Sequence, residues 1–252
     1  MRKLLWLLPF LVLAHGGASL AADNAPAMMP PPAASSDYLQ PGQIDLTTLL
    51  PPPPAPGSPR DKKDIQHLLD LQHHRTPAQA ARALADGDVT VFRFADVLGP
   101  NFAKDKLPVL AAFFDRVRHT ESAFVGPAKD YWARPRPFEA DKRIHPIPQL
   151  KEGVTNKDGT FNHSYPGGHA TFGASCAIIL SNMVPEKRAE LFARGWVFGD
   201  NREMGGVHYP TDEEAGRIDA EVLVYAMEQN PQFQSDFAAA KAELRADLGL
   251  TP

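Results

Sequence analysis

Apolar residues recur every three to four positions along most of the chain after residue 60, and this spacing is typical of helices that bury one face. The first such stretch begins near Asp61, and a longer one runs from Lys106 to about Trp132. The apolar stripe of the longer stretch consists of Leu107, Leu110, Phe114, Val117 and Phe124. The sequence contains no internal repeat and no series of alternating apolar and polar residues, which would indicate strands. The pattern therefore predicts an all-α fold.

The helical pattern continues in the second half of the chain, where prolines mark several helix starts because proline is tolerated in the first helical turn. Asn230 followed by Pro231 is a favourable cap and first-turn pair. The helices predicted here cover residues 170–183, residues 185–200, a segment that begins at Thr211 or Asp212, and a last segment that ends near Gly249.

Three stretches lack a clear helical pattern. Residues 26–59 contain 11 of the 25 prolines, which predicts an extended arm, and the apolar run Ile44–Leu50 would dock its later part. Residues 138–165 predict a long polar loop with prolines and glycines, of a length that often serves as a lid or binding loop. For residues 77–85 the sequence predicts only an alanine-rich turn. The pattern from Val89 to Leu98 fits a strand or a helix.

The first 22 residues have the layout of a secretory signal peptide. Arg2 and Lys3 precede an apolar core from Leu4 to Ala14, and Ser19 to Ala21 offer a cleavage site with small residues. The apolar core is too short for an ordinary membrane-spanning helix, and no later stretch is long and apolar enough. The alternative is a buried N-terminal helix. We expect an exported protein that has no membrane partner.

Composition narrows the possible partners. The net charge is −4, and removal of the first 21 residues takes away Arg2 and Lys3 and no acid, which leaves −6 from 24 basic and 30 acidic residues. An acidic protein is a poor general binder of nucleic acid. Cys176 is the one cysteine of the chain, so it forms no intramolecular disulfide and is predicted to pack as a small buried residue. The oligomeric state is left open, a homo-oligomer included.

Three short segments carry the candidate chemistry. They read K-x6-RP, with Lys129 and Arg136-Pro137; PGGH, with Pro166, Gly167, Gly168 and His169; and R-x5-H-x3-D, with Arg202, His208 and Asp212. Together they supply two histidines, one carboxylate and three fixed cations. These are the groups needed to move a phosphoryl group without a metal or other cofactor.

Each cation and histidine has a role in such a reaction. A phosphomonoester carries about two negative charges near neutral pH, and Lys129, Arg136 and Arg202 can neutralise them. A neutral imidazole can attack phosphorus and form a phosphohistidine. A second imidazole can protonate the leaving alcohol and then activate water.

The carboxylate and the glycines complete the set. If the segment from His208 to Asp212 is helical, both side chains lie on one face, and Asp212 would hold the ring N–H of His208. Gly167 and Gly168 would let backbone amides approach phosphate oxygens. A helix that starts near His169 would add its positive end.

With these segments the chain resembles the phosphatidic-acid-phosphatase type 2 superfamily, and its best match is to the bacterial class A non-specific acid phosphatases. The resemblance covers nearly all of the chain after the signal peptide. Besides the third segment, it rests on the Leu-Leu-Pro-Pro-Pro-Pro run at 49–54, Ala128–Tyr131, Arg134–Phe138 and Ser164–His169.

The resemblance implies that His208 is the nucleophile, Asp212 its partner, and His169 the general acid and base. It implies that Lys129, Arg136 and Arg202 hold the phosphate, helped by the backbone of Gly168. It also favours a helix over residues 89–98, a periplasmic location and an acidic pH optimum.

The chain departs from the family pattern at two positions. The family usually has serine at the position of Gly167, so one phosphate-binding hydroxyl is missing, and it usually has serine just before the arginine, where this chain has Asn201. Neither position supplies the nucleophile or the acid. We expect altered phosphate affinity, rate or substrate range rather than loss of the chemistry.

Four other functions fit parts of the sequence. A zinc hydrolase could use His208, Asp212, His169 and His163, although the chain has no HExxH motif or comparable close ligand set. A vanadium haloperoxidase would use the same anion pocket, since those enzymes resemble this superfamily. A lipid phosphatase would be expected to have spanning segments. A non-catalytic phosphate-binding protein is suggested only by Gly167.

The sequence thus predicts a signal peptide at 1–22, a proline-rich arm at 23–60, and a single-domain helical bundle of the acid phosphatase/vanadium haloperoxidase type at 61–252. The predicted activity is metal-independent, cofactor-free hydrolysis of small phosphate monoesters of broad range. Because the intermediate is covalent, an alcohol could replace water as the acceptor, which would give phosphotransfer.

Overall fold

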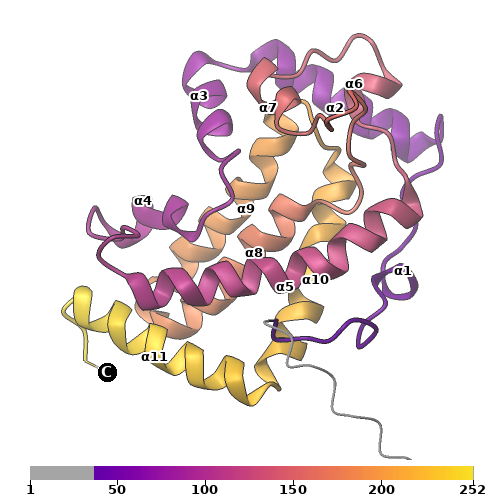
Figure 1. The fold of residues 1–252 in the computed structure, drawn as a ribbon. Coiled ribbons are helices and arrows are strands. Elements are labelled where there is room, and N and C mark those ends of the chain that lie inside the picture. Colours follow the sequence, from indigo (N-terminus) through magenta and orange to yellow (C-terminus); the bar gives the residue numbers. More distant parts are fainter. Residues whose placement is uncertain (1–36, 252) are drawn as a thin grey trace, which may run out of the picture. The chain divides into compact units, whose positions relative to one another are not determined.

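The computed structural model describes residues 37–251, and this part of the chain is helical (Figure 1). The signal peptide and the first part of the arm lie outside the described residues. The elements are α1 (Leu46–Leu49), α2 (Pro59–His74), α3 (Pro77–Ala85), η1 (Val91–Phe94), α4 (Ala95–Leu98), α5 (Pro108–Trp132), α6 (Pro137–Ala140), α7 (Pro148–Glu152), α8 (Gly168–Met183), η2 (Pro185–Lys187), α9 (Arg188–Met204), α10 (Pro210–Glu228) and α11 (Pro231–Asp247). Residues 37–251 contain no β-strand, only one isolated bridge between Thr155 and Phe161. The all-α prediction is confirmed.

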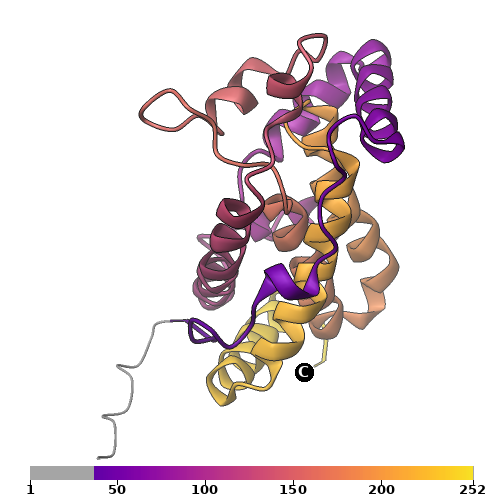
Figure 2. The same ribbon diagram turned by 90° about the vertical axis from the view of Figure 1, so that its right-hand side faces the viewer.

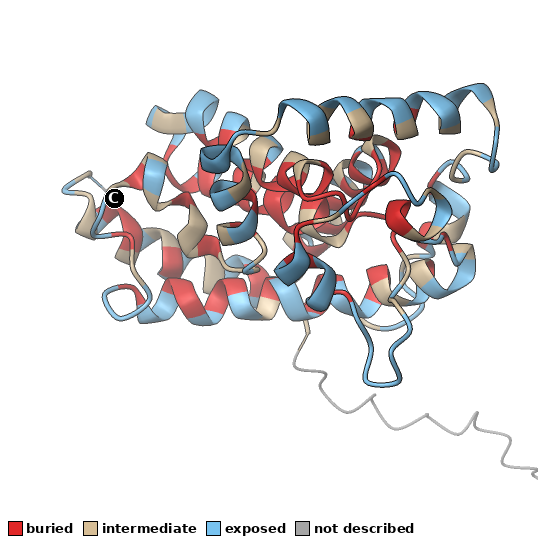
Figure 3. Cartoon of the chain, turned by 90° about the horizontal axis from the view of Figure 1, so that it is seen from above, coloured by how far each residue is buried: buried red, intermediate tan, exposed pale blue. Residues whose placement is uncertain are grey.

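Helix α8 is the centre of the bundle. It packs most extensively against α9 and α10, and most of its residues are buried. Glycines permit the close approach of these helices: a Cβ atom at Gly195 of α9 would lie 2.6 Å from the carbonyl oxygen of Gly173 in α8. Figure 3 shows buried residues concentrated inside the bundle and exposed residues on its outer face. The central helices therefore form a rigid platform whose ends can hold side chains in fixed positions.

Helix α5 packs against α8, α11 and α1. Between α5 and α11 lies an aromatic cluster, in which the Phe113 and Phe233 rings are 5.2 Å apart and Tyr38 contacts both. The backbone N–H of Tyr38 also donates to Thr120 at 3.0 Å. Figure 2 shows the extended segment between α1 and α2 running along the outside of the bundle. The part of the proline-rich arm from residue 37 onward is thus docked through its apolar residues.

Helix starts follow the expected capping chemistry. Ser58 and Thr76 each accept a hydrogen bond from the third residue of the following helix, and each precedes a proline at the first helical position. Residues 77–85, for which the sequence predicted only an alanine-rich turn, form the nine-residue helix α3. Residues 91–98 are helical, as the resemblance implied.

The segment 138–165 is more ordered than a long polar loop. It contains the end of α6 and all of α7, and its apolar side chains form a second small core with α2, α3 and the loop after α9. That core includes Phe138, Ile144, Ile147, Leu150, Val154, Leu68, Ala83 and Val207. Two helices of four and five residues are too short to show periodicity, so this order was not visible in the sequence pattern.

No helix within residues 37–251 is long and apolar enough to cross a membrane.

Candidate active site

The three chemical segments meet at one cavity of about 280 Å³. Its walls include Lys129, Arg136, His169, Arg202 and His208, and the backbone of Gly168 reaches it as well. Leu84, Gly87, Leu150 and Val154 complete much of the rest of the lining. The sequence prediction that these distant residues form one site agrees with the structure.

Each of these side chains comes from or near a helix end. Lys129 lies in the last turn of α5, and Arg136 is the residue before α6. His169 lies in the first turn of α8 and Arg202 in the last turn of α9, whereas His208 lies in the short loop between α9 and α10. Helix ends suit this task because backbone groups there are left without intrahelical partners and can face a ligand.

Arg202 is buried, with 2% of its surface exposed. Among the described residues, neither its Nε nor its Nη1 has a hydrogen-bond partner. Burial lowers the pKa of its guanidinium to about 10, so the group remains charged at neutral pH. Burying these two nitrogens without hydrogen-bond partners is costly even with the charges of Glu213 and Asp86 nearby, so the cavity is suited to an anion.

Lys129 and Arg136 use some of their hydrogen-bond donors on backbone carbonyl groups. Lys129 Nζ donates to the carbonyl oxygens of His163 and Ser164, both at 2.9 Å. Burial, followed by the charge of Arg136, lowers the pKa of Lys129 to about 7. Arg136 donates from Nη1 to the Val207 carbonyl at 2.8 Å, and burial lowers its pKa to about 10. These bonds fix both cations at the cavity wall.

The two histidine rings lie 6.3 Å apart between centroids and are nearly perpendicular, at 85°. His169 Nε2 is 3.2 Å from the carbonyl oxygen of Gly87, and its ring stacks on Phe198. A carbonyl can only accept, so Nε2 of His169 carries a proton. Burial is the largest cause that lowers the pKa of both histidines well below the usual value, and nearby cations, Arg202 for His169 and Arg136 for His208, lower it further.

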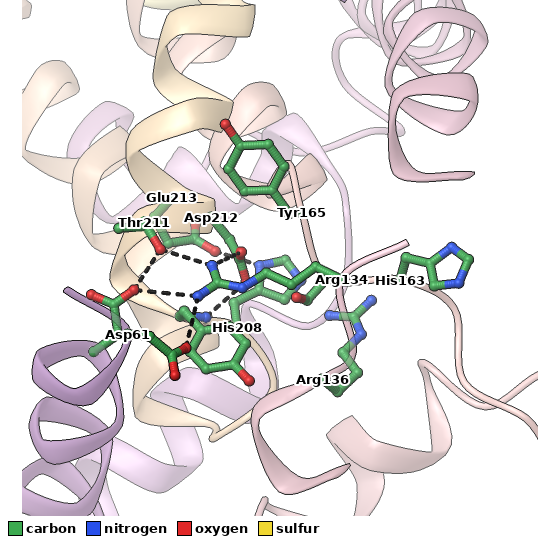
Figure 4. A network of polar contacts seen from close by, with 12 residues as sticks. Asp61, Arg134, Arg136, His163, Tyr165, His208, Thr211, Asp212 and Glu213 are labelled. Atoms are coloured by element: carbon green, nitrogen blue, oxygen red, sulfur yellow. Dashed lines mark hydrogen bonds and ion pairs between the residues drawn. The ribbon is translucent and has the colours of Figure 1, made fainter. Parts of the chain in front are cut away.

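The predicted contact between Asp212 and His208 is wrong. His208 Nδ1 is instead hydrogen-bonded to Glu213 Oε1, and both groups are buried (Figure 4). Asp212 Oδ1 accepts from Arg134 Nη1 at 2.7 Å, and Asp212 Oδ2 accepts from the backbone N–H of Tyr209 at 2.8 Å. The contact was expected only if the segment from His208 to Asp212 is helical, and α10 begins at Pro210. Asp212 is therefore the third residue of α10 and caps its start, which is the use that carboxylates commonly have there.

Gly167 also differs from its predicted role. Its N–H donates to the carbonyl oxygen of Asp212 at 2.9 Å, so this amide is not free for phosphate. It is buried and is not among the residues that line the cavity. Gly168, the first residue of α8, does line it. Of the two predicted glycines, only Gly168 is placed to meet an anion.

Asn201, which stands at the second departure from the family pattern, has a structural contact. Its Nδ2 donates to Asp86 Oδ2 at 2.7 Å, and Asp86 also accepts two hydrogen bonds from Arg194. Asp86 immediately precedes Gly87, whose carbonyl group contacts His169. Asn201 thus helps to hold the backbone that orients the second histidine.

Two residues considered from the sequence lie outside the cavity. His163 is exposed for 37% of its side chain, is 3.6 Å from Asp130, and does not line the cavity; Figure 4 shows it pointing away from the buried network. Arg134, for which the sequence left a salt bridge or a place at the cavity rim open, is a buried salt-bridge residue: it is 6% exposed and pairs with Asp212 and Asp64. Within residues 37–251 no group of three or more His, Cys, Asp or Glu side chains is arranged to hold a metal ion.

A second cavity of about 270 Å³ adjoins the first and shares Lys129, Gly168 and His169 with it. Its other walls are mostly apolar, with Val89, Val125 and Phe172, and Arg118 and Glu121 add charge. His169 therefore faces two adjoining spaces.

Sequence reasoning missed Glu213, Gly87 and Asn162. Arg136 Nε donates to the Asn162 carbonyl at 2.8 Å. Gly87 contacts His169 through its backbone oxygen, which leaves no side-chain signal, whereas Asn162 accepts from Arg136 through both its backbone oxygen and its side-chain Oδ1. Glu213 did leave a signal, since it follows the expected aspartate directly, but its role depends on where α10 begins.

The sequence matches the family described as "PAP2 superfamily" over residues 119–235. It is 34% identical over 204 residues to a protein named "Acid phosphatase" from Zymomonas mobilis, covering 79% of this chain and 75% of that one. It is 28% identical over 248 residues to a "Non-specific acid phosphatase" from Salmonella typhi, covering 96% and 92%. A "Non-specific acid phosphatase" from Salmonella typhimurium is 30% identical over 200 residues, covering 77% and 78%.

Proposed function

The chain belongs to the PAP2 superfamily, and we propose that it is a metal-independent acid phosphatase that hydrolyses phosphate monoesters through a phosphohistidine on His208. The observation that carries the proposal is the Arg202 guanidinium, which is buried without a protein partner for Nε and Nη1 among the described residues. It lies in the same cavity as two histidines and two further cations. Such a cavity fits a phosphoryl group better than a neutral ligand.

Substrate binding would use the cations first. Arg202, Arg136 and Lys129 would surround the phosphoryl oxygens, and the N-terminus of α8 at Gly168 would add its positive end. Lys129 has a pKa of about 7, so it is fully charged under acidic conditions. The cluster would neutralise charge on the phosphoryl group as the P–O bond breaks.

The chemistry would proceed in two steps. Nε2 of His208 attacks phosphorus and forms a P–N bond while the P–O bond to the alcohol breaks, and His169 gives a proton to the departing oxygen. In the second step His169 takes a proton from water, which attacks phosphorus and breaks the P–N bond. Inorganic phosphate and the resting enzyme result. An alcohol in place of that water would give phosphotransfer.

The lowered pKa values support an acidic optimum. His169 must be protonated to act as an acid, and because its pKa lies well below the usual value, this form is populated only at acidic pH. His208 must be neutral to attack, and its own lowered pKa keeps it neutral as the pH falls. The adjoining cavity, mixed in chemistry, supports a broad range of leaving groups. The signal-like N-terminus supports a periplasmic location.

The test is hydrolysis of p-nitrophenyl phosphate across about pH 4 to 9, the range in which histidines titrate, with chelator present. His208→Ala should abolish turnover, whereas His73→Ala, which removes an exposed histidine on α2, should not. Quenching the wild type during turnover with denaturant at alkaline pH should trap a phosphoenzyme that is stable in base and lost in acid, and that His208→Ala lacks. Turnover that requires added metal, or tight phosphate binding with no turnover, would contradict the proposal.

A further inference from the structure

Both oxygens of the Asp212 carboxylate are already committed. Arg134 and the Tyr209 backbone N–H occupy them, and Arg134 also bonds Thr211 Oγ1 at 2.7 Å and lies over the Tyr209 ring at 3.7 Å. This arrangement fixes the start of α10 against α2. Asp212 therefore cannot turn to His208 without giving up a buried ion pair and a helix cap.

Glu213 reaches His208 through a space that two glycines leave open. A Cβ atom at Gly167 would lie 2.9 Å from Glu213 Oε1, and one at Gly199 would lie 2.7 Å from Glu213 Oε2. Neither glycine has a positive φ angle, so backbone conformation does not require glycine at these positions. Space does: a Cβ atom at Gly167 would meet the Asp212 carbonyl oxygen at 2.8 Å as well as the Glu213 carboxyl group, and at Gly199 the Glu213 carboxyl group is the nearest neighbour.

The space that holds the Glu213 carboxyl group is closed to solvent. Glu213 is fully buried, and its Oε2 has no hydrogen-bond partner in the part of the chain that is described. Its single polar contact is thus with Nδ1 of His208. A buried carboxyl group is unfavourable unless something offsets the cost, and a pure packing role would be served better by an apolar side chain.

We propose that Glu213, rather than Asp212, is the positioning residue for His208, and that Gly167 and Gly199 form the slot that admits its carboxyl group. This inference rests on the proposed phosphatase function and adds to it. It also gives a reason for glycine at position 167, where the resemblance led us to expect serine. A serine side chain would occupy the space that the Glu213 carboxyl group now fills.

The tautomer of His208 depends on this contact. An ionised Glu213 accepts the Nδ1 proton, so the lone pair on Nε2 is free to attack phosphorus. As the P–N bond forms, the ring becomes cationic, and the carboxylate stabilises it while the proton stays on Nδ1. A protonated Glu213 would donate to Nδ1 instead, and the ring proton would then lie on Nε2 and block the attack.

Several charged groups face Glu213 from the elements around it. Burial is the largest cause that raises its pKa well above the usual value, and Glu203, Asp212 and Asp200 raise it further, whereas Arg217 lowers it. These residues belong to α9 and α10. A phosphate or phosphoryl group in the cavity adds negative charge on the far side of His208. Protonation of Glu213 therefore sets the acidic limb of the pH–rate profile and limits how far toward low pH the optimum can lie, and this limb is expected to report the Glu213–His208 pair as a unit.

The test compares Glu213→Gln with Asp212→Asn and with Glu203→Gln. Glu203 is a matched control, because it is a nearly buried glutamate that faces His67 at 2.8 Å instead of His208. We expect Glu213→Gln to lower kcat on p-nitrophenyl phosphate by about 100-fold or more, to leave KM within about threefold, and to shift the acidic limb. Glu203→Gln should keep kcat within about threefold, and because Glu203 raises the pKa of Glu213, its acidic limb should move to lower pH. Asp212→Asn should lower Tm because the ion pair with Arg134 is lost, and its acidic limb should move in the same direction without the large loss of kcat expected for Glu213→Gln.

A second readout does not depend on turnover. Proton NMR of the phosphate-bound protein should show a low-field resonance from His208 Nδ1–H, which disappears in His208→Ala and Glu213→Gln and persists in Asp212→Asn. If the resonance behaves so but no variant turns over, the proposed function fails while the positioning role stands. The inference is overturned if Glu213→Gln keeps the wild-type kcat and pH limb, or if Asp212→Asn alone removes the resonance.

Discussion

The guanidinium of Arg202 has the strongest reason of the three cations to bind an anion, since Lys129 and Arg136 already donate to backbone carbonyls. Replacement by lysine would keep the charge but lose the planar fork. Hydrogen bonds to charged groups contribute about 1.5–3 kcal/mol each. We therefore expect Arg202→Lys to weaken phosphate inhibition and to raise KM by about 10- to 100-fold.

The control for this substitution is Arg82→Lys, which changes an exposed arginine of α3 that pairs with Asp96 at 3.2 Å. Product inhibition by inorganic phosphate and KM for p-nitrophenyl phosphate would be measured for both variants. Unchanged phosphate inhibition in Arg202→Lys would show that the fork does not contact the phosphoryl group.

Gly167 allows the residue-level argument to be tested by restoring what the resemblance led us to expect. In Gly167→Ser the new Cβ would lie 2.8 Å from the Asp212 carbonyl oxygen and 2.9 Å from Glu213 Oε1, so the Glu213 side chain must move. We expect kcat to fall by about 10-fold or more, as is typical when the group that orients a reactive ring is disturbed.

A double-mutant cycle with Glu213→Gln distinguishes this from a general packing defect. If Gly167→Ser acts by displacing Glu213, it should cost little additional activity once Glu213 is already replaced. Fully additive losses, or a gain of activity in Gly167→Ser, would contradict the proposal that Gly167 makes room for the Glu213 carboxyl group.

Most members of the site could be predicted from residue spacing, because the chemistry requires cations and imidazoles and few other residues of those types occur in such combinations. Which acid contacts His208 could not be predicted in this way. Three consecutive acids, Asp212, Glu213 and Glu214, follow Thr211, and which one faces His208 depends on where α10 begins. Helix boundaries are the least certain part of sequence reasoning, and here a boundary decides a catalytic contact.

At the scale of helices, the contact between α8 and α9 depends on glycine. In Gly195→Ala the added methyl group would meet the backbone oxygen of Gly173 at 2.6 Å and Ala177 Cβ at 2.7 Å. Backbone cannot move as easily as a side chain, so the two helices must separate. We expect a loss of about 1–3 kcal/mol in the free energy of unfolding, the usual cost of overpacking.

Gly126→Ala is the matched control, because that glycine lies within α5 and a Cβ atom there meets nothing within 4 Å. Alanine is favoured over glycine in a helix interior by roughly 0.5–1 kcal/mol, so this variant should be slightly stabilised. Urea unfolding of both variants should show a lower free energy of unfolding for Gly195→Ala and a slightly higher one for Gly126→Ala. Equal effects would mean that the α8–α9 contact tolerates a wider spacing.

The predicted helices were largely found where long apolar periodicity exists, as in α5, α8 and α10. The prediction failed where an element is short and its order comes from distant partners. Leu150 in α7 is buried against residues of the second core, which include Leu68 in α2 and Val207 after α9. Such contacts join segments more than 50 residues apart, and no local pattern encodes them.

At the scale of the whole molecule, buried acids beneath the cavity should set how stability varies with pH. Glu121 in α5 and Asp219 in α10 are buried, and burial raises the pKa of each to about 8. Within residues 37–251, Glu121 Oε1 and both carboxyl oxygens of Asp219 lack hydrogen-bond partners. In the unfolded chain both groups would titrate near pH 4.

The direction in which stability changes with pH follows from the number of protons that the folded and unfolded states bind. Between about pH 4 and 8 the folded protein holds protons on Glu121 and Asp219 that the unfolded chain has lost, so the free energy of unfolding falls as pH rises. His169 and His208 act in the opposite direction, because their lowered pKa values make the unfolded chain bind more protons below about pH 6.5. Lys129, with a pKa of about 7, likewise favours the folded state as pH rises above that value.

Glu121→Gln isolates one of these contributions, since glutamine has a similar shape and does not titrate. Relative to wild type, its free energy of unfolding should rise between pH 5 and 7 by about 2 kcal/mol, close to the limit of one proton per molecule over that range. Glu190→Gln, on the exposed face of α9, should give a curve parallel to wild type. Urea unfolding at pH 5, 6 and 7 measures all three proteins. A parallel curve for Glu121→Gln would mean that Glu121 is ionised in the folded protein. Ser175 and Arg118, which lie near it, would then have to offset the cost of burying its charge.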